Sequence, residues 1–112
     1  NIFMTKVIVN GDYSGFKITG HSGYSEAGSD IVCAAISSAA QLCIIAVTEV
    51  MNIPAEVKAD NKEAMLYFKI SDNINEELRN SASCIIKAFL IQCESIKEDY
   101  PDFIDIILWG CN

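Results

Sequence analysis

The sequence predicts an α+β domain in which two helices cover a mostly antiparallel sheet, in the order β-β-α-β-β-α-β. Three patterns predict this fold. Short segments in which apolar and polar residues alternate come in pairs separated by turn residues, which is typical of β-hairpins. Two longer segments predict helices, and each follows one of these pairs. The first is small and apolar almost all round, and the second carries apolar residues at helical intervals. A last strand-like segment ends the chain.

The first hairpin is predicted near the start of the chain. Lys6–Asn10 is rich in residues that favour strands and runs into Asn10-Gly11-Asp12. This segment is a strong turn signal, because both Asn and Gly tolerate a positive φ. The second strand is expected from Tyr13 to Thr19, with Phe16 and Ile18 on one face.

A loop and a central helix follow the first hairpin. Residues 20–29 hold three glycines and no apolar periodicity, which predicts a mobile loop. Residues 30 to about 51 are small or apolar almost all round, which predicts a helix packed on more than one side and ended by Asn52 and Pro54. The apolar stretch 31–47 falls short of the roughly 20 residues that span a bilayer. We therefore interpret it as a buried helix and expect no membrane contact.

The second hairpin is predicted between residues 55 and 70. Ala55–Ala59 alternates, Asp60-Asn61-Lys62 forms a turn, and the residues from 64 to 70 alternate again. Because the alternation has the period of a strand on both sides of the turn, two antiparallel strands are expected here.

A second helix and a last strand complete the domain. Asn73, with Glu76 three residues later, has the spacing of a helix start, and apolar residues then recur at helical intervals. The helix is expected to end before Tyr100-Pro101, because proline disfavours helix in the residue ahead of it. Residues 103–109 form the predicted last strand. Four aromatic residues fit the core stripes of their elements and are expected to be buried: Phe68, Phe89, Phe103 and Trp109.

Length and composition favour a single domain that covers residues 1–112. The chain is 51% hydrophobic, which is enough for a core without disulfides. The net charge of −7 and the scattering of only eight Lys and Arg argue against direct nucleic-acid contact, which needs a clustered basic face. A basic protein or peptide is easier to accommodate as a partner. Residues 1–3 look like a leader or a cloning remnant, because Met4 would make a natural start.

The cysteines indicate a reducing compartment. They form an odd set of five and no signal peptide precedes them, so the cytoplasm is the expected location. No pair has C-x-x-C spacing and the chain has one histidine, so we expect no metal and no other cofactor. Three cysteines lie deep in helical patterns and are expected to be buried, namely Cys43, Cys84 and Cys93. Cys111, near the end of the chain, is expected to be an incidental exposed thiol.

Cys33 and His21 are the candidate nucleophile and general base. If Asp30 caps the central helix, Cys33 falls at the third helical position, where free backbone N–H groups and the helix dipole favour a thiolate. His21 ends a predicted strand, and the eleven residues between it and Cys33 can loop back to bring the two together. His21 would then take the proton of Cys33, and the thiolate would attack a peptide carbonyl.

Each of these residues also has a plain structural interpretation. Cys33 could be a small buried hydrophobe, and His21 could be a surface loop residue. Asp30 either caps the helix or orients His21, and capping is the favoured role. Ser37, one turn beyond Cys33, either reaches the loop or bonds to its own helix backbone. Tyr24 could line a substrate groove, although exposed tyrosines in turns are common.

Residues 20–24, Gly28 and residues 30–37 together resemble the signature of the ribosomal-processing cysteine protease family, known as Prp. The resemblance implies a cysteine endopeptidase that removes an N-terminal extension from large-subunit ribosomal protein number twenty-seven, after an aromatic-rich motif. It implies His21 and Cys33 as the catalytic pair. It implies supporting or loop roles for Asp30, Ser37, Gly20, Ser22, Gly23, Tyr24 and Gly28.

The resemblance also implies a bacterial homodimer in which the loop between the catalytic residues moves when substrate binds. Ser22 departs from the family, which commonly has alanine there, and the change is small enough to leave the catalytic pair undisturbed. The acidic balance suits a basic ribosomal protein precursor as substrate. The alternative function is a non-catalytic dimeric ribosome-assembly factor that binds the same ribosomal protein with its exposed sheet face and leaves the peptide intact.

Overall fold

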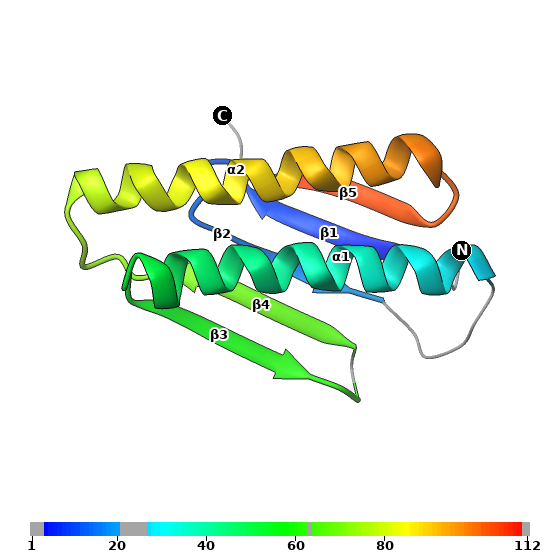
Figure 1. Cartoon of the computed structure of the whole chain (residues 1–112), viewed down its shortest axis with the longest axis horizontal. Helices are drawn as coiled ribbons and strands as arrows, with labels where there is room; N and C mark the ends of the chain where they lie inside the picture. The colour runs from blue at the N-terminus through cyan, green and yellow to red at the C-terminus, as the bar shows by residue number, and fades with distance from the viewer. Residues whose placement is uncertain (1–3, 21–26, 63, 111–112) are drawn as a thin grey trace.

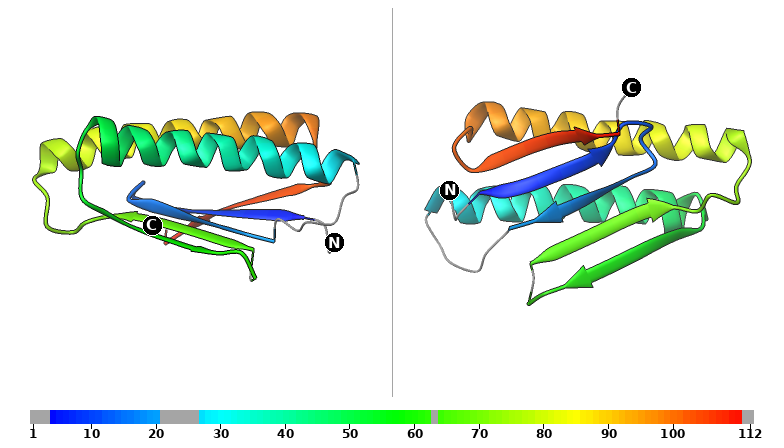
Figure 2. Two further views of the ribbon diagram at one scale, coloured as in Figure 1. Left: turned by 60° about the horizontal axis from the view of Figure 1, so that its bottom comes forward. Right: turned by 180° about the vertical axis from the view of Figure 1, so that it is seen from behind.

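The fold consists of a five-stranded sheet with two helices lying side by side on one of its faces (Figures 1 and 2). The computed structural model describes residues 4–20, 27–62 and 64–110, and for residues 27–30 it describes the backbone alone. The predicted order β-β-α-β-β-α-β and the α+β class are confirmed. The strands are β1 (Thr5–Asn10), β2 (Gly15–Thr19), β3 (Ala55–Asp60), β4 (Met65–Ile70) and β5 (Ile104–Trp109). The helices are α1 (Ala27–Ile45), the short π-helix η1 (Ala46–Val50) and α2 (Glu76–Asp99).

The strand order in the sheet is β3-β4-β2-β1-β5. Both predicted hairpins form, and antiparallel pairing of β2 with β4 joins them into one sheet. β5 pairs in parallel with β1, with Thr5 opposite Ile104. Three of the four strand pairs are therefore antiparallel, as predicted, and β3 and β5 form the two edges of the sheet.

The core lies between the sheet and the helices. Phe16 and Ile18 point to the helix side of β2, as their alternation predicts, and both are buried. The ring of Phe16 stacks on that of Phe89 from α2 with centroids 4.3 Å apart and lies 5.3 Å from that of Phe68 on β4. The prediction for Trp109 is wrong: its side chain is 69% exposed, because it ends an edge strand on the face that the helices leave open.

α1 packs on the sheet along one side and on α2 along another. Its buried residues recur at helical spacing and are Val32, Ile36, Ala40 and Cys43, followed by Val47 in η1. A second side of α1 packs on α2, so the prediction of a helix packed on more than one side is confirmed. The outer side is open to solvent, where Leu42 is 68% exposed. Ile31–Val50 is also long and apolar enough to cross a membrane by length and composition, although a core helix of a soluble protein meets the same criteria.

Two predicted helix starts are displaced along the sequence. α1 begins at Ala27, three residues before Asp30, so Asp30 lies inside the first turn and does not occupy the cap position. α2 is capped by Asn75, whose side-chain oxygen accepts a hydrogen bond of 2.8 Å from the N–H of Leu78. The cap therefore falls two residues after the predicted Asn73, although the predicted end before Tyr100 is confirmed.

Candidate active site around Cys33

Cys33 is the seventh residue of α1 and is half-buried. The prediction that it occupies the third helical position is wrong, because the helix begins earlier than expected. Only the first four N–H groups of a helix lack partners within it, and the dipole effect falls off within the first turn. At its observed place Cys33 therefore lies beyond the free N–H groups on which the prediction rested.

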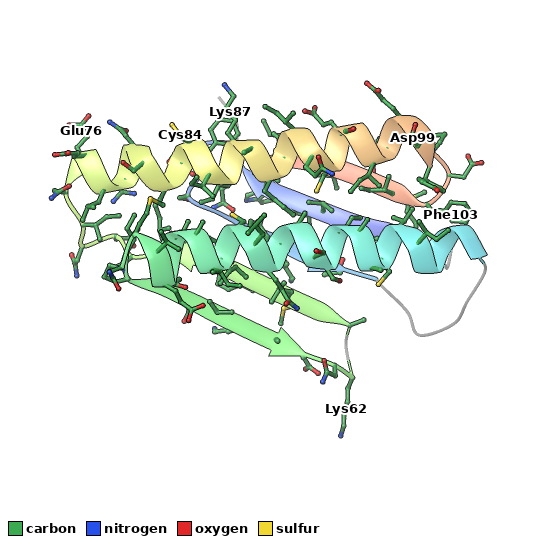
Figure 3. All side chains as sticks on the ribbon, viewed as in Figure 1. Lys62, Glu76, Cys84, Lys87, Asp99 and Phe103 are labelled. Atoms are coloured by element: carbon green, nitrogen blue, oxygen red, sulfur yellow. The ribbon has the colours of Figure 1, made fainter. Side chains whose placement is uncertain are left out.

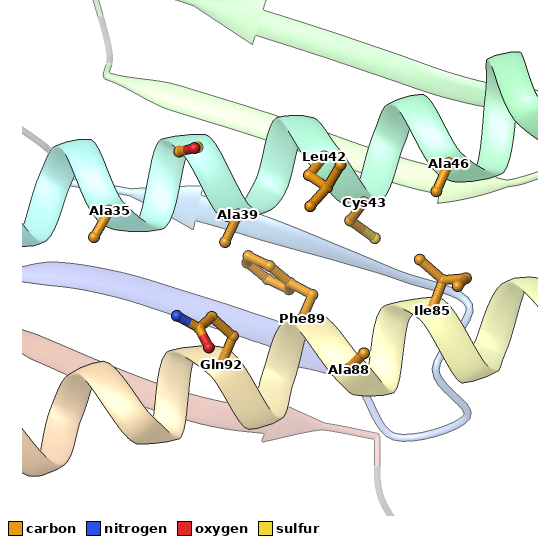
Figure 4. A pocket seen from close by; sticks show the side chains of 10 residues that line it. Ala35, Ala39, Leu42, Cys43, Ala46, Ile85, Ala88, Phe89 and Gln92 are labelled. Atoms are coloured by element: carbon orange, nitrogen blue, oxygen red, sulfur yellow. The ribbon is translucent and has the colours of Figure 1, made fainter.

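The flank of α1 that carries Cys33 faces away from α2. Ala35 and Ala39 lie on the side of α1 that faces α2 (Figure 4), and Val32 points into the core. Because successive residues of a helix are about 100° apart, Cys33 lies on the flank opposite to these alanines. Ser37, one turn further on, shares this flank and is also half-buried, so the structure places these two predicted site residues together.

The other described cysteines have different surroundings, and the four described cysteines form no disulfide. Cys43 and Cys93 are buried as predicted, and burial raises the pKa of each thiol to about 12. Cys84 is exposed, which corrects its prediction, and Figure 3 shows its side chain on the side of α2 that points away from α1. Only Cys33 and Cys84 of these four can therefore present a reactive thiol to solvent.

Gly20 directly follows β2 and has a φ of 80°, a conformation that favours glycine. A Cβ atom there would lie 2.7 Å from the backbone oxygen of Met4, so the position also lacks room for a side chain. Its N–H donates a hydrogen bond of 3.2 Å to the carbonyl of Ala64. The glycine therefore turns the chain out of the sheet immediately before His21.

The rest of the predicted site lies mostly outside the described residues. This applies to His21, Ser22, Gly23 and Tyr24. Gly28 belongs to the first turn of α1 rather than to the predicted loop, and Asp30 lies in the same turn. Within the described ranges, no three His, Cys, Asp or Glu side chains gather into a group that could hold a metal ion.

A cavity of about 650 Å³ lies between α1 and α2 (Figure 4). Its walls are mainly apolar and include Ala35, Ala39, Leu42, Phe89 and the unreactive thiol of Cys43. It therefore offers space but no reactive thiol, and it lies on the flank of α1 opposite to Cys33. The sequence analysis did not identify this cavity, although alanines at helical spacing on α1 are a signal for it.

Comparison with known proteins identifies the family. The family model of the cysteine protease Prp matches residues 4–105, which include His21 and Cys33. The ribosomal processing cysteine protease Prp of Bacillus subtilis (strain 168) is 26% identical over 87 residues, which are 78% of this chain and 78% of that protein. The predicted resemblance is thus confirmed by an independent match over most of the chain.

Solved structures share the fold. The crystal structure of the essential ribosomal processing protease Prp from S. aureus, in complex with a substrate peptide, has a TM-score of 0.76 and 20% identity, covering 94% of this chain and 97% of that chain. SMU.848 from Streptococcus mutans has a TM-score of 0.75 and 22% identity, covering 94% of this chain and 91% of that one. With the match over residues 4–105, the chain belongs to the Prp family of cysteine proteases and is a peptide hydrolase.

Proposed function

We propose that this protease removes the N-terminal extension of large-subunit ribosomal protein number twenty-seven, with Cys33 as nucleophile and His21 as general base. The observation that carries the proposal is the half-buried thiol of Cys33 on the flank of α1 that α2 does not cover, within the segment that matches the family. The Bacillus subtilis relative is a ribosomal processing protease, which supports a ribosomal protein precursor as substrate. The net charge of −7 suits a basic substrate of this kind.

The proposed reaction has two steps. His21 takes the proton of Cys33, and the thiolate sulfur attacks the carbonyl carbon of the scissile bond. His21 then returns the proton to the leaving amine, so the peptide bond breaks and an acyl-enzyme thioester remains. Water, deprotonated by His21, attacks the thioester carbonyl, releases the new carboxylate and restores Cys33. Backbone N–H groups of the glycine-rich segment stabilise the oxyanion that forms in both steps.

Asp30 supports His21 in this proposal. The cap position of α1 lies before Ala27, so capping no longer accounts for the carboxyl group of Asp30. An aspartate that accepts a hydrogen bond from an imidazole holds the ring in one tautomer and stabilises its protonated form. We assign this orienting role to Asp30 and propose that Ser37, on the same flank as Cys33, supports the site.

We further propose that the protein acts as a homodimer in the cytoplasm. An odd number of cysteines suits a reducing compartment. Between Ile31 and Thr48 the first helix carries no charged residue, yet its outer side is largely exposed. Two copies, each with a charge of −7, can meet across such a surface without opposing like charges.

Cleavage of a peptide that spans the extension junction tests the proposed activity. We expect mass analysis to show two products with the wild-type protein and none with Cys33→Ala or Cys33→Ser, because only a thiolate attacks efficiently at neutral pH. Cys84→Ser is the matched control, since it removes the exposed thiol among the described cysteines and should leave cleavage intact. Iodoacetamide should label Cys33 faster than Cys84. Cleavage by Cys33→Ala would exclude the mechanism, and a peptide that is bound but left intact by the wild type would favour the assembly factor.

A further inference from the structure

The edge strand β3 is apolar on a face that the protein does not cover. The side chains on one face are all charged, namely Glu56, Lys58 and Asp60, and those on the other are Ala55, Val57 and Ala59. The register places the second set on the helix side of the sheet, since Val57 lies opposite the buried Phe68. Nevertheless Val57 is 46% exposed and Ala59 is exposed.

The widths of the two layers explain this exposure. Two helices side by side cover about 20 Å, whereas five strands span about 24 Å. In Figures 1 and 2, β3 lies outside the pair of helices, beyond α1. Exposed edge strands usually carry charge, which discourages unwanted pairing. On the open face of β3, Glu56 and Lys58 supply this charge and form an ion pair of 3.7 Å. The exposed face on the helix side carries no such charge, so its apolar residues need another explanation.

The apolar face of β3 continues the flank of α1 that carries the nucleophile. Leu66 of β4, opposite Ala59 in the register, is half-buried against the core and lies between the two surfaces. We call the resulting surface the trough and define it by Cys33, Ser37, Leu66, Val57 and Ala59. None of these residues is charged, although the chain as a whole has a charge of −7.

We propose that the trough seats the apolar residues of an extended substrate peptide beside Cys33, so that Val57, Ala59 and Leu66 determine specificity. The inference rests on the proposed peptidase function of Cys33. Alternate residues of β3 are about 6.6 Å apart, which is also the spacing of alternate side chains in an extended peptide. Successive apolar side chains on one side of the substrate therefore match Val57 and Ala59 in turn. The basic residues of the substrate lie outside the trough, on the surrounding surface of this acidic protein, which attracts positive charge.

The test compares two changes on the same strand that alter the charge equally. Val57→Glu puts a carboxylate in the trough, whereas Lys58→Gln removes one positive charge on the opposite face. We expect Val57→Glu to lower kcat/KM about tenfold or more for a peptide with large apolar residues before the scissile bond, because burying a carboxylate beside them is costly. Lys58→Gln should change it by no more than about twofold. Ala59→Glu should repeat the loss, and thermal unfolding should confirm that all three variants fold.

Binding to the inactive Cys33→Ala protein separates this inference from the catalytic proposal. Fluorescence anisotropy with a labelled copy of the same peptide should show weaker binding when Val57→Glu is added and unchanged binding when Lys58→Gln is added. Iodoacetamide is too small to need the trough, so its rate with Cys33 should be the same in Val57→Glu as in the wild type. Wild-type binding and cleavage in both Val57→Glu and Ala59→Glu would overturn the trough. A wild type that binds but does not cleave would instead refute the protease and leave the trough intact.

Discussion

The described cysteines show how surroundings decide what one residue type does. Cys43 and Cys93 lie in the core, where a thiolate would lose its hydration, so the protonated form is favoured. Cys84 reaches solvent, and Cys33 lies half-buried at the border between α1 and the trough. A thiol that is accessible to a peptide and shielded on one side is suited to catalysis, because a neighbouring imidazole acts more strongly where water is scarce.

The two buried thiols should make the protein sensitive to alkali. In the unfolded chain the pKa of a cysteine thiol lies near its ordinary value of 9.0, whereas burial raises the pKa of Cys43 and Cys93 to about 12. Each thiol therefore contributes stability that is complete below pH 9 and is lost between about pH 9 and 12. The free energy of unfolding should fall by about 1.4 kcal/mol per pH unit for each thiol in that range.

Urea unfolding between pH 8 and pH 11 measures this effect. Cys43→Val should remove about half of the slope that the two thiols produce, whereas Cys84→Ser should leave the slope unchanged. The prediction fails if Cys43→Val and the wild type lose stability equally over the alkaline range.

At the scale of elements, the strands were more predictable from the sequence than the helix starts. Alternation and turn residues identified both hairpins, because a strand with one buried face must alternate. Helix starts depend on cap geometry, and two candidate caps two residues apart, Asn73 and Asn75, look alike in sequence. The first turn of α1 contains Gly28 and Ser29, which are poor helix formers, so the loop was predicted to extend through it.

The cap of α2 can be tested by substitution. Asn75→Ala removes the acceptor for the N–H of Leu78 and should lower the free energy of unfolding by about 1 kcal/mol. Asn73→Ala is the control, because the bond at Asn73 uses its backbone N–H, which donates to the hydroxyl of Ser71. Its effect should stay within about 0.5 kcal/mol. Equal losses of stability in the two variants in urea unfolding would contradict the assignment of Asn75 as the cap.

At the scale of the molecule, the way in which the helices cover the sheet decides which side chains are exposed. Sequence spacing predicted that Cys33 and Ser37 share one face of the helix. It could not predict whether another element of the fold covers that face. The exposure of Leu42 and Val57 could not be predicted, since it follows from the lateral position of α1 on the sheet. The result is a helix layer whose outer surface is apolar along α1, where Leu42 is exposed, and carries the charged Lys87, Glu94 and Glu98 beside Ile91 on α2.

The uncharged outer side of α1, with the adjoining edge of α2, is the contact that we expect in the homodimer. A helix of 19 residues is about 28 Å long, and two helices are about 20 Å wide, so each copy offers a flat footprint of about 560 Å² before side-chain relief is counted. Stable interfaces bury about 800 Å² of accessible surface per partner, which is of the same order. Leu42, 68% exposed at the rim of the alanine-lined cavity, is suited to pack against the cavity of the second copy.

Leu42→Glu should therefore convert the protein to monomers, because it would place a carboxylate in an apolar contact. Light scattering after gel filtration should give the mass of two chains for the wild type and 12.3 kDa for the variant. Leu108→Glu is the matched control, since it adds the same charge to an exposed leucine on the edge strand β5. Because Leu42 and Cys33 lie on different sides of α1, monomeric Leu42→Glu should still react with iodoacetamide at Cys33. A wild-type mass of 12.3 kDa at micromolar concentrations, or an unchanged dimer in Leu42→Glu, would refute this interface.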